Sequence, residues 1–193
     1  MSRDDEQYIS KKYEEYGYVL DNLPHGRIGS LRPSFRGEGL VQMIGESYYT
    51  LLEAVPRRGS AFQIGDRVYV GKRGRIEIEH IVGRISYEQL TSTAKEELPR
   101  IIEMIVSSQE AMFVAFFNES QPITPRMHSM ELLPGIGKKL MWQVINQRDI
   151  SKFKSFEDLR ERANIPGPVK IISRRILDEL SKEEKYRLFT RPA

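Results

Sequence analysis

The sequence predicts an α+β protein in which a small β-barrel comes first and an all-helical region follows. Short runs rich in β-branched and aromatic residues fill residues 16–85, whereas apolar residues recur at helical spacing from residue 91 onward. Hydrophobic residues make up 39% and charged residues 30% of the 193-residue chain, and this composition supports a packed core. The length suits one domain, or two small domains that share an interface.

The N-terminal part is predicted to contain an arm and five strands. Residues 1–14 are charged and polar, and we expect them to form an arm outside the fold. Gly65 and Asp66 are typical of a tight turn that leads into a strand. Because closing a sheet removes its exposed edges, five short strands fit a small OB-like barrel, which we assign to residues 15–118 together with appended helices. The predicted strands are 16–21, 40–44, 48–55, 67–70 and 76–85.

The connecting segment, residues 91–118, has helical spacing. Thr93 and Glu96 match a capping box at its start. Pro99 is expected either to kink this helix or to start it afresh, since proline lacks the amide that an interior helical position needs. A polar stretch with two prolines follows and marks a domain boundary, so that residues 119–193 form the second domain.

A glycine loop between two helices carries the strongest functional signal. Thr124 is expected to cap a helix over residues 125–132, which ends at Leu-Pro-Gly-Ile-Gly, residues 133–137. The free amides and the positive dipole end of the next helix point outward from such a loop, and the glycines permit close backbone approach. This arrangement binds a phosphate oxygen, and Lys138 and Lys139 add positive charge.

The pattern then repeats. Ser155 gives the capping signal of another helix, and residues 165–170 have the sequence Ile-Pro-Gly-Pro-Val-Lys. Pro168 removes an amide and Val169 restricts the backbone, so we expect the second loop to bind phosphate more weakly than the first.

This segment resembles the helix–hairpin–helix family of nucleic-acid-binding motifs, whose loop has the sequence Leu-Pro-Gly-Ile-Gly-Lys. The resemblance implies that two units pack about a pseudo-two-fold axis, with both hairpins on one side and each facing one backbone of a duplex. The competing interpretation is a helical protein-interaction module built on the same scaffold. The residues of this module expected to contact nucleic acid are Gly135, Ile136, Gly137, Lys138, Lys139, Gly167, Lys170 and Arg174.

An OB-like barrel followed by this tandem helix–hairpin–helix module, over nearly the full chain, resembles an uncharacterised archaeal family of nucleic-acid-binding proteins. The resemblance implies a partner that is DNA or RNA and a role near ribosomal RNA or DNA maintenance. Charge agrees with such a partner: residues 1–124 carry 15 Lys and Arg against 18 Asp and Glu, whereas residues 125–193 carry 15 against 9. A solvated helix surface rich in lysine and arginine is the alternative explanation of the basic third.

Two connections of the predicted barrel are also basic. Arg27, Arg32 and Arg36 lie in the first of them, and residues 56–75 hold six Lys and Arg against one acid. Cations interleaved with aromatic rings suit single-stranded nucleic acid, because the cations follow phosphates while the rings stack on bases. The alternative is an adaptor whose barrel binds a protein partner. The candidate residues of this second site are Arg57, Arg58, Arg67, Tyr69, Lys72, Arg73 and Arg75.

Several functional classes are excluded at this stage. The chain has no cysteine and only three histidines, far apart, so we expect neither a metal nor another cofactor. It has no phosphate-binding P-loop, nucleophile elbow or His-Glu-x-x-His pattern, and we expect no enzymatic activity. A DNA glycosylase-like enzyme is the less favoured alternative, with Lys138 or Lys139 paired with Asp149 or Asp158. The longest apolar run, residues 111–117, is too short to span a bilayer, and we expect a soluble cytoplasmic protein.

Overall fold

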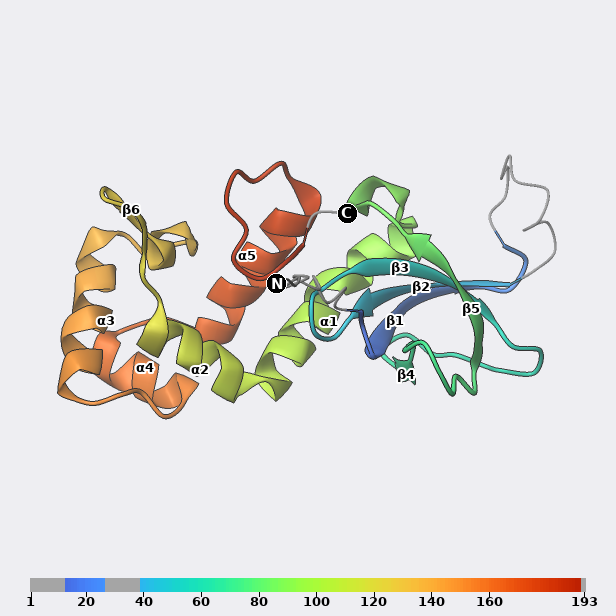
Figure 1. Ribbon diagram of the computed structural model, residues 1–193, viewed down its shortest axis with the longest axis horizontal. Helices are drawn as coiled ribbons and strands as arrows, with labels where there is room; N and C mark the ends of the chain where they lie inside the picture. The colour runs from blue at the N-terminus through green and yellow to red at the C-terminus, as the bar shows by residue number, and fades with distance from the viewer. Residues whose placement is uncertain (1–12, 27–38, 192–193) are drawn as a thin grey trace, which may run out of the picture.

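The computed structural model describes residues 13–26 and 39–191, in which a curled antiparallel sheet and a helical region lie side by side (Figure 1). The strands of the main sheet are β1 (Tyr16–Leu23), β2 (Leu40–Gly45), β3 (Leu51–Pro56), β4 (Arg67–Tyr69) and β5 (Ile78–Arg84). A small hairpin consists of β6 (Pro122–Thr124) and β7 (Met127–His128). The helices are α1 (Ser92–Ser108), α2 (Glu110–Glu119), α3 (Lys138–Ile150), α4 (Phe156–Ala163) and α5 (Pro168–Ser181), with 3-10 turns η2 (Tyr87–Gln89) and η3 (Ser129–Leu132).

All five predicted strands are present, and together they form a half-barrel. The strand order is β4-β1-β2-β3-β5, and every neighbouring pair is antiparallel. Irregularities in the strand pairing, between Val19 and Asp21 in β1 and at two places where β3 pairs with β5, favour strong curvature. Among the described residues β4 and β5 remain the two edges and do not pair, so the sheet is curled rather than closed.

Both faces of β1 are buried between Gly17 and Leu20, which explains the apolar run there. Val19 points into the curl, where it packs with Val41 and Met43 of β2. Tyr18 and Leu20 point the other way and belong to the large core that also contains the helices. The alternation of strand side chains therefore serves two cores, one on each face of the sheet.

The end of the predicted N-terminal arm belongs to the fold, which corrects the sequence-based boundary at residue 14. Glu14 is buried, and its carboxylate holds the turn between β2 and β3. In this turn Tyr49 adopts a left-handed φ of 54°, so β3 begins at Leu51 instead of Tyr48. The carboxylate oxygens accept hydrogen bonds from the backbone amides of Ser47 at 2.9 Å, Tyr48 at 3.0 Å and Thr50 at 3.1 Å.

The start of α1 differs from the prediction by two residues. Thr91, and not Thr93, caps the helix, and its hydroxyl accepts a hydrogen bond from the amide of Ala94 at 3.0 Å. The same hydroxyl donates to Asp21 of β1 at 2.7 Å, so a contact with the sheet selects the cap. Pro99 lies inside α1 without ending it.

Helix α1 connects the two parts of the molecule. It packs against β1 on one side and α5 on the other, and its buried residues join a core that reaches from the sheet to α3, α4 and α5. Across residues 13–26 and 39–191 no single helix has the length and apolar composition needed to cross a membrane; only α1 and α2 taken together reach them, and these two meet at a bend of 76°. The division at residue 119 stays a prediction.

Candidate functional site

The first helix of the predicted motif is almost absent, and this corrects the expectation for residues 125–132. Thr124 does not cap a helix; its hydroxyl accepts from the amide of Arg126 at 3.3 Å in the turn between β6 and β7. A capping box forms later, where His128 Nδ1 accepts from the backbone amide of Met130 and the Glu131 carboxylate accepts from the amide of His128. The chain therefore makes a hairpin and a single 3-10 turn, η3, before the glycine loop.

The glycine loop, residues 133–137, has a buried side that packs in the core and a side that is exposed to solvent. Leu133 precedes a proline and is extended, with φ −78° and ψ 129°, which ends η3. Gly135 adopts a left-handed φ of 83°, a conformation that favours glycine. Ile136 is 3% exposed and packs in the core, while Gly135 and Gly137 are exposed. The buried isoleucine fixes the loop so that its glycines face solvent.

The N-terminus of α3 has no side-chain cap. Gly137 occupies the cap position, whereas Thr91 and Ser155 cap α1 and α4 with their hydroxyls. Among the described residues no acceptor pairs with the first three amides of α3, which come from Lys138, Lys139 and Leu140. Both lysine side chains are exposed, and no described carboxylate lies within ion-pair distance of them. Free amides, the helix dipole and two ammonium groups therefore meet at one exposed end.

The helix before the second loop, α4, has the predicted cap, and the helix after it, α5, begins differently from α3. The Ser155 hydroxyl accepts from the amide of Asp158 at 3.1 Å, as expected. Gly167, with φ 59°, caps α5, and Pro168 is its first residue, a position where the missing amide would be unpaired in any case. Val169 is half-buried against the core. The second loop therefore keeps fewer free amides than the first.

The two loops lie at different places in the helical region, and their pairing about a pseudo-two-fold axis stays a prediction. In Figure 1, α3 begins beside the β6–β7 hairpin, whereas α5 begins lower, near α4 and α2. Lys170 and Arg174 are both exposed on α5, and Arg174 pairs with Asp178 at 3.4 Å. Among the described residues the first loop has three amides without an acceptor and two unpaired lysines, whereas the second has two such amides and one unpaired lysine, Lys170.

Of the predicted second site on the sheet, four residues are engaged within the protein. Arg67 forms a bidentate pair with Glu46, at 2.8 Å for both contacts, and lies 3.5 Å from the centroid of the Tyr16 ring. Tyr69 packs edge-on against the same Tyr16 ring. Lys72 lies over the ring of Tyr13, and Arg75 donates to the carbonyl of Gly71 at 2.6 Å.

Arg57, Arg58 and Arg73 are exposed in the loops that flank β4, and within the described chain no carboxylate pairs with them. Arg27, Arg32 and Arg36 lie outside the described residues. The Arg67 guanidinium, by hydrogen bonding to Glu46, holds the pKa of that carboxyl below its usual range. The engaged arginine is thus part of the fold, and the free cations of this surface are fewer than predicted.

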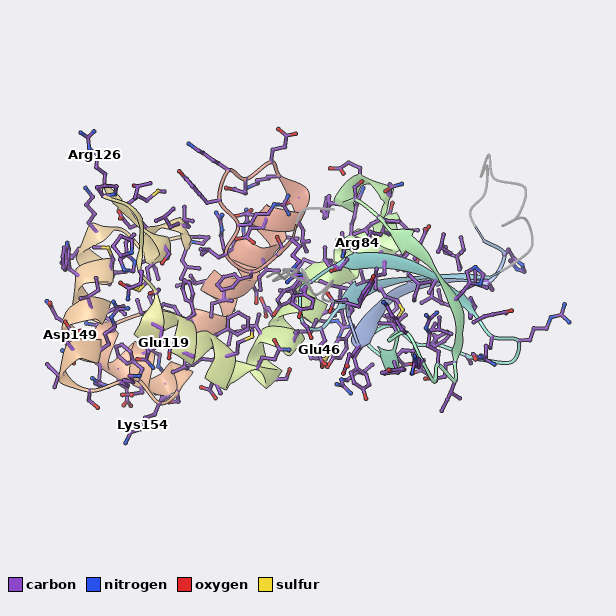
Figure 2. All side chains as sticks on the ribbon, in the orientation of Figure 1. Glu46, Arg84, Glu119, Arg126, Asp149 and Lys154 are labelled. Atoms are coloured by element: carbon purple, nitrogen blue, oxygen red, sulfur yellow. The ribbon has the colours of Figure 1, made fainter. Side chains whose placement is uncertain are left out.

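Sequence reasoning missed a groove of about 650 Å³ between the β6–β7 hairpin and α3. Trp142, the single tryptophan of the chain, lines it and is 57% exposed. Arg126 lies at the tip of the hairpin above α3 (Figure 2). The available signal was the spacing of Lys138 and Trp142, which are four residues apart and therefore share one face of α3.

A second missed feature is a cleft of about 380 Å³ between the sheet and the C-terminal segment. Arg84 of β5, Arg187 and Arg191 line it, and none of the three forms an ion pair with a carboxylate in the part of the chain that the structure describes. Arg84 lies 103 positions before Arg187, so no local pattern could have joined it to Arg187 and Arg191.

Of the residues named for the alternative catalytic pair, Lys138 and Asp149 lie far apart on α3. Lys138 begins α3 and Asp149 is near its end, about 16 Å along the helix axis at 1.5 Å per residue, and Figure 2 shows Asp149 far from Arg126. Asp158 accepts from the amide of Lys154 and pairs with Arg162. Within the described ranges there is no group of three or more His, Cys, Asp or Glu residues suited to a metal ion.

Fold and site together define a type of α+β protein in which a curled five-stranded sheet is joined to helices, with an exposed glycine loop before α3. The chain belongs to the family described as "Protein of unknown function (DUF655)", whose model matches residues 13–191.

Two relatives are similar to this chain over more than nine-tenths of its length. One, "Uncharacterized protein MJ0038" of Methanocaldococcus jannaschii, is 46% identical over 183 residues, which cover 94% of this chain and 82% of that protein. The other is a crystal structure, Af1531 from Archaeoglobus fulgidus. It is 46% identical with a TM-score of 0.84 and covers 92% of this chain and 100% of its own.

Proposed function

We propose that the protein binds nucleic acid by its phosphate backbone at the start of α3, without catalysing a reaction. The uncapped N-terminus of α3 carries this proposal: three amides without acceptors in the described chain stand beside the exposed ammonium groups of Lys138 and Lys139. Such helix ends bind phosphate oxygens, and phosphates carry no sequence information. We therefore expect weak binding without base preference.

The finer fold assignment supports the same function. We regard residues 119–191 as a helix–hairpin–helix module whose first helix is shortened to η3, and the half-barrel as OB-like in its five strands and its curl. Arg57, Arg58 and Arg73 are the cations of the sheet surface available for a second contact with the polyanion.

The experiment measures the affinity of the full chain for a fluorescently labelled oligonucleotide over a range of salt concentrations. The double variant Lys138→Gln/Lys139→Gln is expected to bind more weakly. If each lysine neutralises one phosphate of a single strand, its log–log salt slope should be smaller by about 1.4.

A matched control removes the same charge from the same region. Lys152 and Lys154 are exposed on the connection between α3 and α4. Figure 2 shows Lys154 far from Arg126 at the tip of the β6–β7 hairpin. The variant Lys152→Gln/Lys154→Gln should keep most of the affinity. Equal losses in both double variants would mean that only net charge matters, and would refute a site at the start of α3.

A further inference from the structure

The groove beside the start of α3 has an aromatic wall and a positive rim. Its apolar lining includes Met127 of the hairpin together with Met141, Trp142 and Ile145 of α3. Trp142 is 57% exposed, although tryptophan side chains are mostly buried in folded proteins. The groove volume of about 650 Å³ is in the size range of small-ligand sites, and the exposed indole forms part of its wall.

The charges around the groove favour an anionic occupant. Arg126 and Lys138 line the groove and are exposed, and no described carboxylate pairs with either. Arg148 is committed to the carbonyl oxygens of Phe117 and Ser120. Glu131 is the one acid among the lining residues, and its carboxylate accepts a hydrogen bond from the amide of His128. The two free groups at the rim are thus both cationic.

The groove adjoins the proposed phosphate site. Lys138 and Trp142 are four residues apart on α3, so they share a face and lie about 6 Å apart along the axis. This offset suits a nucleotide whose phosphate lies on the amides at the start of α3 and whose base lies one helical turn further on. An aromatic ring exposed at that place offers a stacking surface that any base can use.

We propose that Trp142 stacks on an unpaired base next to the phosphate held at the start of α3, so that the protein prefers single strands, loops or frayed ends to intact duplex. The inference rests on the proposed function and names its substrate class. In a continuous duplex the faces of the bases are covered by their neighbours, and a side chain at the backbone cannot stack on them.

The test uses the fluorescence of the single tryptophan, which reports on this groove alone. The probes are an eight-nucleotide single-stranded DNA, its RNA counterpart, an abasic strand with the same phosphates, and a blunt duplex. Both base-containing single strands should quench Trp142 emission, whereas the abasic strand should bind with little quenching and the duplex should bind more weakly than the single strands.

Two variants separate the base from the phosphate. Trp142→Ala should weaken binding of the base-containing strands by about 5- to 150-fold, as expected from one stacked base, and leave abasic-strand affinity unchanged. Trp142→Phe should restore most of the affinity. Because the indole is exposed, both variants are expected to fold, and thermal unfolding checks this.

The outcomes distinguish this inference from the proposed function. If Lys138→Gln/Lys139→Gln weakens abasic-strand binding while Trp142→Ala changes nothing, the phosphate site stands and the stacking site is refuted. If the abasic strand does not bind even at low salt, the proposed function itself fails. Quenching by an acidic, amphipathic peptide and by none of the oligonucleotides would overturn both and assign the groove to a protein partner.

Discussion

Filling the cap position of α3 should separate helix stability from phosphate binding. Gly137 has φ −87° and ψ 179°, which any residue adopts, and a Cβ placed there meets no atom within 4 Å. An aspartate at this position can accept from the amide of Leu140, as Thr91 and Ser155 accept from the third residue of their own helices. Gly137→Asp therefore puts a carboxylate of the protein where we expect the phosphate.

The two expected effects have opposite signs. Replacing a glycine cap with Asp stabilises a helix by a few tenths of a kcal/mol, and a negative charge at the dipole adds about 0.3–1 kcal/mol. Binding should weaken by the value of a hydrogen bond to a charged group, about 1.5–3 kcal/mol, which corresponds to about 10- to 150-fold in the dissociation constant. Gly137→Asn has the same shape without the charge, and should lose only severalfold.

The assay combines urea unfolding with fluorescence anisotropy of the full chain and a labelled single strand at low salt. We expect Gly137→Asp to be at least as stable as the wild type and to bind much more weakly, with Gly137→Asn between them. Wild-type affinity in a folded Gly137→Asp protein would refute phosphate binding at the start of α3. A loss of stability in both variants would show instead that the loop does not tolerate a side chain.

Two further predictions concern the fold around the site. Glu179 is fully buried, pairs with the buried Arg175 at 2.8 Å and accepts hydrogen bonds from the three backbone amides of residues 188–190. Glu179→Ala should therefore lower the free energy of unfolding by about 3–5 kcal/mol, because it leaves the Arg175 charge buried without its partner. A loss below about 1 kcal/mol in urea titration would contradict this. Burial and the nearby Arg148 lower the pKa of His128 from its usual 6.5, so its contribution to stability is complete above pH 6.5 and is lost as the pH falls below it, towards the folded-state pKa. Thermal unfolding of the wild type and His128→Asn between pH 7.5 and 5.5 should show a steeper loss in the wild type, and parallel curves would argue against the shift.

Local pattern was sufficient where neighbours in sequence make the structure. All five strands were predicted because β-branched residues and turn signals alternate within a few residues. The exposed glycine loop at residues 133–137 and the cap at Ser155 were predicted for the same reason. Each of these features could be predicted because the residues that signal it lie within a few positions of one another.

Local pattern failed where a distant residue selects between alternatives. Thr91 and Thr93 both suit a helix start, and Asp21 of β1 decides for Thr91 by accepting from its hydroxyl. Arg67 had the appearance of a free cation on a basic loop, but Glu46, 21 residues away, pairs with it. A sequence lists charges without showing which of them are already neutralised.

The sequence by itself determined the α+β class, the five strands and the exposed start of α3, where glycine occupies the cap position. These features depend on the spacing of apolar residues and on turn residues that are close together in the chain. The tertiary structure decided that the sheet curls without closing, that residues 122–128 form a hairpin, and that this hairpin faces Trp142 across a groove. Curvature, hairpin placement and groove arise from packing between elements far apart in the chain. The stability of these features depends on which surfaces pack against each other, and the tertiary structure alone shows which surfaces do so.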